Sequence, residues 1–266
     1  MKKDVPSSLK ALGRENLPDT IDVRGACFKR ERIFKNDFFA VTALYQRDSE
    51  KVLLKVQRQA SFWGLPMRWL GRILARREWA LLELASDIRG IPKLITRWGE
   101  TGIIREFIDG KPLEKGRRVP DEFHGQLREI IDALHARNMA YVDLEKCENV
   151  LLGDDGRPYL FDFQIAWYLS KRFGGELWPM RKLRTWLQNG DRYHLVKLQR
   201  RTRPDQLTPL QLAASYKKPW YLHTHRLVTM PFTRLRRMIL DRIDPRRGGS
   251  ERGKVVEDIV TGDQSP

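Results

Sequence analysis

Five short runs rich in apolar and β-branched residues dominate the first 108 positions of the chain. They cover residues 27–33, 38–45, 51–56, 93–98 and 102–108, and polar segments such as RDSE and GET separate them. Runs of this length with such breaks are typical of an antiparallel sheet. Between the third and fourth runs, apolar residues recur at helical spacing over residues 65–85. These positions therefore predict a small antiparallel sheet with one helix.

The middle of the chain predicts a further helix and a hairpin. Apolar residues from Phe123 to Leu134 step at helical spacing, and Asn138 stands where a helix would end. Residues 149–152 and 159–163 flank the segment GDDGRP, which is typical of a hairpin. The predicted class is α+β. Residues 1–20 are expected to form a loose arm and residues 245–266 a disordered tail, because both are polar and offer little apolar area to bury.

Composition limits the class of protein. Eight Trp, eleven Phe and seven Tyr in 266 residues can supply an ordered core. No run approaches the roughly 20 apolar residues of a membrane span, the basic N-terminus lacks the apolar part of a secretory signal, and two cysteines make no disulfide framework. We therefore expect a cytoplasmic protein.

The basic charge is concentrated in one part of the chain. The formal net charge is +16, and residues 171–254 hold 21 Lys and Arg against 6 Asp and Glu. Such a field attracts phosphate-rich partners, namely nucleic acid, an anionic membrane or an acidic substrate. A solvated basic surface is the alternative.

One further charge lies inside an aliphatic strand. Lys55 stands in the run VLLKV, and a buried ammonium group requires an anionic partner. Glu78, on the following helix, can supply the carboxylate. Lys51 shares the strand face of Lys55 but stands at the start of the strand, where solvent is expected. Glu83 is the alternative to Glu78, and the spacing of the apolar residues around the two favours Glu78.

Three polar residues surround the predicted hairpin. Asp143 and Asn149 lie in the segment YVDLEKCENVLL, and Asp162 lies in YLFDFQ. Asp and Asn favour turns, so a purely local role is the alternative. In chain order, however, VLLKV, IIREFIDGKPL, LHARNMAYVDLEKCENVLL and LFDFQ resemble the lysine, hinge, catalytic-loop and metal-binding segments of the protein-kinase-like superfamily. The resemblance covers residues 28–168, and the 13 positions between Asn149 and Asp162 are close to the usual gap.

The resemblance implies a two-lobed fold with ATP and Mg²⁺ between the lobes. Residues 21–108 would form the N-lobe, a small antiparallel sheet with one helix, and residues 109–244 the mainly helical C-lobe. Asp143 would be the catalytic residue that accepts or orients the proton of the acceptor hydroxyl, and Asn149 and Asp162 would hold the metal.

The remaining nucleotide contacts follow from the same resemblance. Lys55 would bind the α- and β-phosphates, and Glu78 would fix that lysine in place. The hinge backbone from Glu106 to Ile108 would bind adenine. Lys146 would contact the γ-phosphate, with a solvated loop lysine as the alternative.

Several positions depart from the superfamily's pattern. The loop RIFKNDFFAV has no glycine, so either side-chain charge from Lys35 or Arg32 replaces the backbone phosphate clamp or the nucleotide binds weakly. Tyr141 and Val142 replace the His-Arg pair before the catalytic aspartate. Gln164 replaces a glycine, which restricts rearrangement of its segment.

Within the superfamily, the short basic and aromatic chain after residue 164 is most similar to the lipopolysaccharide kinases that phosphorylate Kdo or heptose. That similarity implies a sugar or lipid-linked sugar acceptor, met at the inner face of the cytoplasmic membrane. Residues 61–78 and 217–243 mix aromatic and basic side chains, which suits an anionic membrane surface, with ordinary packing as the alternative.

Three other interpretations remain. A serine/threonine protein kinase would use the same chemistry on a different acceptor. A non-catalytic pseudokinase scaffold is the interpretation suggested by the glycine-free loop. Binding of RNA or DNA ranks last, because no nucleic-acid motif accompanies the basic charge.

Overall fold

The chain divides into two compact units, Met1–Arg203 and Pro204–Pro266. In this computed structural model, residues 10–216 are described, apart from residues 63 and 115. The first unit holds every predicted site residue. The described part of the second unit contains a 3-10 turn, Pro204–Gln206, and helix α4, Pro209–Tyr216. The predicted tail and the stretch 217–243 lie outside the described residues.

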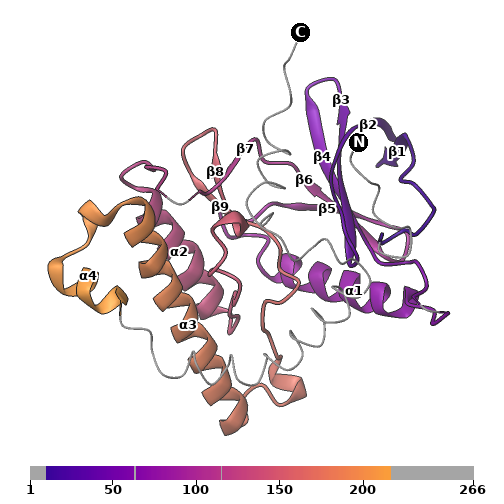
Figure 1. Ribbon diagram of the computed structural model, residues 1–266. Coiled ribbons are helices and arrows are strands. Elements are labelled where there is room, and N and C mark those ends of the chain that lie inside the picture. Colours follow the sequence, from indigo (N-terminus) through magenta and orange to yellow (C-terminus); the bar gives the residue numbers. More distant parts are fainter. Residues whose placement is uncertain (1–9, 63, 115, 217–266) are drawn as a thin grey trace. The chain divides into compact units, whose positions relative to one another are not determined.

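A six-stranded antiparallel sheet forms the first part of the chain (Figure 1). The five runs read from the sequence correspond to strands β2 to β6, and a short strand, β1, precedes them. In spatial order the strands are β1 (Thr20–Val23), β2 (Ala26–Asn36), β3 (Ala40–Arg47), β4 (Glu50–Gln57), β6 (Gly102–Glu106) and β5 (Leu94–Trp98).

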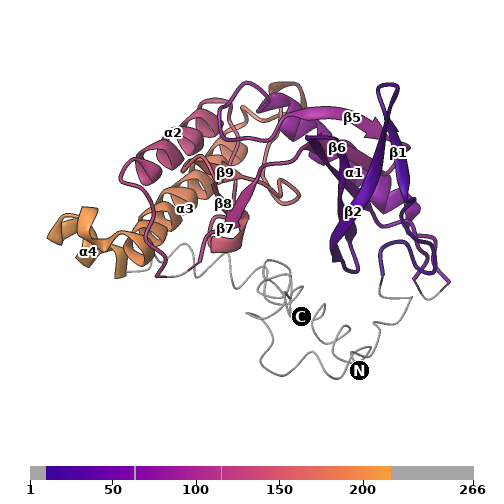
Figure 2. The same ribbon diagram turned by 90° about the horizontal axis from the view of Figure 1, so that it is seen from above.

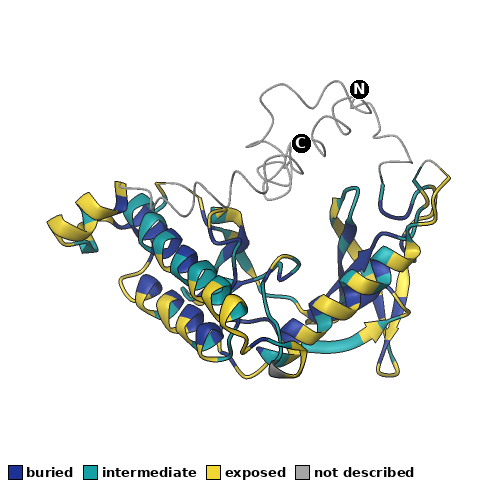
Figure 3. Ribbon diagram, turned by 90° about the horizontal axis from the view of Figure 1, so that it is seen from below, coloured by how far each residue is buried: buried dark blue, intermediate teal, exposed yellow. Residues whose placement is uncertain are grey.

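Helix α1 (Arg68–Leu84) packs against β4, β5 and β6. One side of the helix buries Ala75, Glu78 and Leu81, while Trp69 and Ile73 on the other side are exposed (Figure 3). The approach is close at Gly71, because a Cβ atom there would lie 2.1 Å from the Arg58 carbonyl oxygen. A larger residue at that position would push the helix away from the end of β4.

The second half of the first unit combines a small sheet with two helices. Strands β7 (Gly110–Pro112), β8 (Val150–Gly153) and β9 (Pro158–Leu160) pair antiparallel in that order. Helices α2 (Phe123–Ala136) and α3 (Trp178–Thr202) lie side by side (Figure 2). Asn138, predicted to end the first of these helices, has a φ of +62° just beyond it, as a left-handed helix terminus requires.

Two buried polar contacts join α2 to α3. His124 Nε2 lies 2.7 Å from Thr202 Oγ1, and His135 Nε2 lies 3.0 Å from Asp191 Oδ2. The Thr202 hydroxyl donates to the carbonyl oxygen of Leu198, so His124 must donate through Nε2. Burial and nearby arginines lower the pKa of His124 from 6.5 to about 4. At neutral pH His124 is therefore uncharged and donates through Nε2.

Two apolar clusters make up the core. One joins α1, α2, α3, β8 and β9, and the other lies among β1 to β4 and β6. Leu12 and Leu17 belong to the second cluster, and the Tyr45 hydroxyl donates to the Pro18 carbonyl oxygen at 2.7 Å. The expectation of a loose arm over residues 1–20 is therefore wrong from residue 10 onward, because these leucines supply the apolar area that anchors it.

The α+β class is confirmed. No described helix is long and apolar enough to cross a bilayer.

Candidate active site

Lys55 lies on the buried part of strand β4, with 7% of its surface exposed. Its Nζ is 2.8 Å from Glu78 Oε1 on α1 and 3.2 Å from Asp162 Oδ1 in the segment after β9. Burial acts to lower the pKa of Lys55, but the two carboxylates raise it more, so the ammonium group stays charged. The alternative residues lie elsewhere: Lys51 pairs with Asp109 near the surface, and Glu83 is exposed.

Glu78 also accepts a hydrogen bond that the sequence did not reveal. Gln57, fully buried on β4, donates from Nε2 to Glu78 Oε2 at 2.8 Å. Gln164 Nε2 in turn donates to Gln57 Oε1 at 3.0 Å. Lys55 and Gln57 thus both contact Glu78. Asp162 contacts Lys55, and Gln164 contacts Gln57. These contacts form a closed ring that ties the segment after β9 to β4 and α1.

The loop before Asp143 makes a tight turn. The Asp143 amide donates to the Tyr141 carbonyl oxygen at 2.9 Å, and Val142 between them has a φ of +70°. A β-branched residue in this region is strained. Asp191 on α3 holds the turn, because its two carboxylate oxygens accept the Tyr141 and Val142 amides, each at 2.8 Å. Asp191 is almost fully buried, so it is a structural anchor of the loop that no sequence motif marked.

Asp143 and Asn149 lie together in this loop. The Asn149 side-chain amide donates to the Asp143 carbonyl oxygen at 3.1 Å, and Lys146 Nζ lies 2.7 Å from Asp143 Oδ2. The Tyr141 hydroxyl donates to the carbonyl oxygen of Phe161 at 2.5 Å and lies 3.4 Å from that of Asn149. Burial raises the pKa of Tyr141 well above 10, so it remains a neutral donor. The tyrosine therefore links the loop to the residue that precedes Asp162.

Asp162 has a φ of +70°, another unusual backbone position for a residue other than glycine. Burial acts to raise the pKa of its carboxyl, but Lys55 and, to a lesser extent, Lys35 and Lys146 lower it more, so the group is ionised. The amide nitrogen of Asn149 is already used, which leaves its oxygen as an acceptor. An ionised carboxylate and an amide oxygen are the donors that Mg²⁺ prefers, so these two residues fit such an ion.

The predicted hinge follows strand β6. The Glu106 amide donates to the Lys93 carbonyl oxygen at 2.9 Å, so this N–H is not available to a ligand. Among the described residues, the Ile108 amide makes no backbone hydrogen bond. The ring of Phe107 stacks on Phe34 of β2 with a centroid separation of 5.8 Å. The amide of Ile108 is therefore a hinge donor open to a base.

Arg105, one residue before the hinge, was missed from the sequence. It is 8% exposed, and its guanidinium lies 6.0 Å from the centre of the Phe161 ring. Burial lowers its pKa, while Glu78 and Asp162 act in the opposite direction. The site thus holds two cations beside two acids. A charge inside the run GIIRE is the same signal that identified Lys55, and it could have revealed Arg105.

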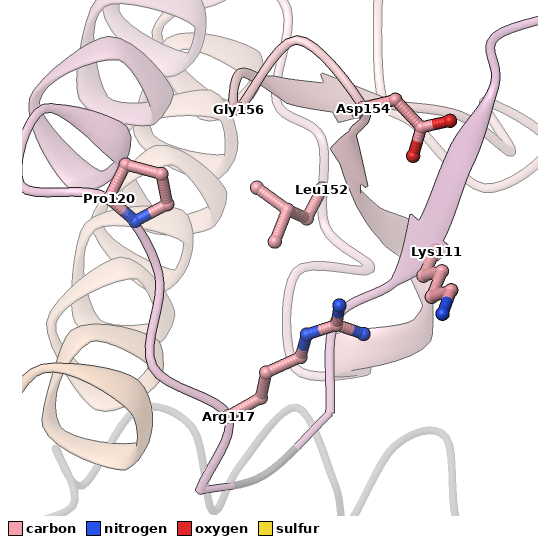
Figure 4. Close-up of a pocket in the computed structure, with 7 residues that line it drawn as sticks. Lys111, Arg117, Pro120, Leu152, Asp154 and Gly156 are labelled. Atoms are coloured by element: carbon pink, nitrogen blue, oxygen red, sulfur yellow. The ribbon is translucent and has the colours of Figure 1, made fainter.

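A pocket of about 320 Å³ lies beside the turn between β8 and β9 (Figure 4). Its lining includes Lys111, Arg117, Leu152 and Asp154. None of the residues predicted for catalysis, nucleotide binding or metal binding lines it. This pocket is therefore separate from the cluster around Lys55.

Comparison with solved structures finds many similar chains. The chain matches the Rio2 kinase from Chaetomium thermophilum with a TM-score of 0.46 and 16% sequence identity, over 67% of this chain and 59% of that one. The chain thus spans less than two thirds of the length of that kinase. No family model and no curated protein matches the sequence. The interpretation of the site therefore depends on its own geometry.

Proposed function

We propose that the chain is an ATP-dependent kinase of the protein-kinase-like superfamily, which transfers the γ-phosphoryl group to a hydroxyl acceptor. The observation that carries the proposal is the position of Lys55, whose buried ammonium group lies within 3.2 Å of both Glu78 and Asp162. These residues come from β4, from α1 and from the segment after β9. A purely structural ion pair needs one acid, whereas a phosphate-binding lysine with a metal-binding aspartate beside it needs both.

The roles follow from the contacts. Lys55 binds the α- and β-phosphates, and Glu78 keeps its ammonium group in place. Asp143 accepts or orients the proton of the incoming hydroxyl, in a loop whose shape is set by Asp191. Asn149 and Asp162 hold Mg²⁺, which neutralises charge on the phosphates when it is bound.

The nucleotide is proposed to lie between two lobes. One lobe is the six-stranded sheet with α1, and the other contains β7 to β9, α2 and α3. The Ile108 amide binds the adenine ring, and Glu106 contributes its carbonyl oxygen. Lys146 pairs with Asp143 at 2.7 Å, and we propose that it moves to the γ-phosphate when the nucleotide binds.

For the acceptor, we propose a lipid-linked sugar, as in the lipopolysaccharide inner core, at an anionic membrane surface. A patch of exposed side chains in the first turns of α3 and in the segment just before it supports this proposal. Phe173, Leu177 and Trp178 are 75%, 62% and 70% exposed. Arg172, Arg181 and Lys182 beside them are exposed as well. Aromatic and leucine side chains flanked by basic groups suit the headgroup region of an anionic bilayer.

Binding and turnover of ATP test whether the protein is an enzyme. The purified protein is expected to show an Mg·ATP-dependent increase in its melting temperature and to hydrolyse or transfer labelled phosphate. Asp162→Ala should lose nucleotide binding, while Asp143→Asn should bind and not react. Lys51→Ala, on the same strand as Lys55 but paired at the surface, is the control. If the wild-type protein neither binds nor turns over ATP, a scaffold role replaces the enzyme.

A second assay tests the acceptor. The protein is incubated with γ-labelled ATP, lipid-linked core oligosaccharide and a protein extract. Label in the lipid fraction supports the sugar acceptor. Label confined to protein bands would refute it and would leave a serine/threonine protein kinase.

A further inference from the structure

In the loop between β2 and β3, two backbone amides donate hydrogen bonds to a side chain of the same loop. The amides of Phe39 and Ala40 donate to Asp37 Oδ1 at 2.9 and 3.0 Å. In a glycine-rich loop, consecutive amides of this kind bind phosphate oxygens. Here a carboxylate of the chain itself already occupies them.

Arg58 also fixes this loop in place. Arg58, at the end of β4, donates from Nη1 to the Phe38 carbonyl oxygen at 2.8 Å, and its guanidinium lies 3.9 Å from the centre of the Phe38 ring. The Arg58 amide donates to the Phe39 carbonyl oxygen at 2.7 Å. A loop held in this way cannot fold its backbone around a phosphate chain, so any contact must come from side chains.

Lys35 is placed to make that contact. It pairs with Thr42 across β2 and β3, and Thr42 pairs with Lys55 across β3 and β4. Directly paired residues project from the same face of a sheet. Lys35 and Lys55 therefore share one face, two strand spacings or about 10 Å apart. The side chain of Lys35 is 59% exposed, and its Nζ lies 2.9 Å from Asp37 Oδ2.

The electrostatics of Asp162 agree with this placement. Burial acts to raise its pKa, but the charges of Lys55, Lys35 and Lys146 lower it more, so the pKa is lowered overall. Three lysines from three elements thus act on one carboxylate at the proposed metal site. Arg32, the other candidate from the sequence, has its guanidinium 4.5 Å from the centre of the Phe34 ring.

We propose that Lys35 binds the terminal phosphates of the nucleotide in place of a glycine-rich loop, and that Asp37 holds Lys35 until the nucleotide arrives. This inference rests on the proposed kinase function. Asp37 has two opposed effects: it orders the loop through the amides, and it competes with phosphate for the ammonium group of Lys35. The two effects can be separated by substitution.

Calorimetric titration with Mg·ATP, Mg·ADP and adenosine tests the proposal. Lys35→Ala should weaken Mg·ATP binding about tenfold, because a charge-assisted contact to phosphate is lost. The loss should be smaller for Mg·ADP and absent for adenosine. Asp37→Asn keeps an oxygen for the two amides but removes the competing charge, so it should tighten Mg·ATP binding about threefold. Lys29→Ala, on the same strand and away from the site, should change nothing.

The two substitutions should change the affinity for Mg·ATP in opposite directions, and this difference distinguishes competition by Asp37 from a role in loop shape alone. If Asp37 only shaped the loop, Asp37→Asn would weaken binding or leave it unchanged, and either result overturns the proposal. Equal affinity of Lys35→Ala and wild type overturns it too, while leaving the kinase function intact. Absence of nucleotide binding in the wild type would refute both the role of Lys35 and the proposed kinase function.

Discussion

Replacing Gln57 tests the ring of contacts around Glu78. Gln57→Leu keeps nearly the same volume but leaves Glu78 Oε2 and Gln164 Nε2 without their partner. Glu78 is 2% exposed, so water cannot replace the lost donor. Loss of a buried bond to a charged group together with a neutral one should lower the free energy of unfolding by about 2–4 kcal/mol.

The second variant isolates one bond of the ring. Gln164→Ala removes only the contact to Gln57 Oε1 and should cost about 1 kcal/mol. In the Gln57→Leu background that contact is already absent, so the second substitution should cost close to nothing. The double-mutant cycle should therefore give a coupling of about 1 kcal/mol.

Urea unfolding followed by tryptophan fluorescence measures all four proteins. Gln46→Leu, at a partly exposed position on β3, is the control and should change stability by less than about 0.5 kcal/mol. A Gln57→Leu protein as stable as that control would refute the ring as a source of stability. Additive effects of the two substitutions would show that Gln57 and Gln164 act separately.

Three further predictions concern the second half of the first unit. Tyr141→Phe loses the hydroxyl contact to Phe161 and should lower the free energy of unfolding by about 1 kcal/mol in urea and raise the Mg²⁺ concentration required for nucleotide binding. Asp191→Asn places an amide against a backbone amide and should cost about 3 kcal/mol, measured by thermal unfolding, with a larger loss of turnover than Tyr141→Phe. His124 is neutral when folded, so the unfolded chain takes up a proton first as the pH falls below 6.5, and stability should drop by about 2 kcal/mol between pH 7 and pH 5. His124→Gln should remove this part of the pH dependence, and an unchanged profile in that variant would contradict the assignment.

The sequence predicted those contacts that leave a local signal. A charge within an aliphatic run indicated that Lys55 is buried, and helical spacing selected Glu78 rather than Glu83 as its partner. The residues are 2.8 Å apart in the structure. Because a buried charge needs a partner wherever the chain folds, this inference required no knowledge of the tertiary arrangement.

Other elements were missed because their signal is tertiary. Helix α3 contains the sequence Asn189-Gly190-Asp191, which is typical of a turn. Packing against α2 overrides that local preference and makes Asp191 the anchor of the Asp143 loop. Gln57 and Gln164 are ordinary polar residues in the sequence, and only their meeting across 107 positions gives them a role. Strand β1 alternates over only four residues, and β7 has only three, so neither run is long enough to stand out in the sequence.

The contacts of Asp191 have a consequence for biosynthesis. A ribosome that has released the first 165 residues has already produced every residue proposed for phosphate and metal binding. The carboxylate that holds the Val142 turn lies 49 positions after that valine and is still inside the exit tunnel. The nascent polypeptide should therefore remain unable to position its proposed proton acceptor, Asp143, until the long helix has emerged.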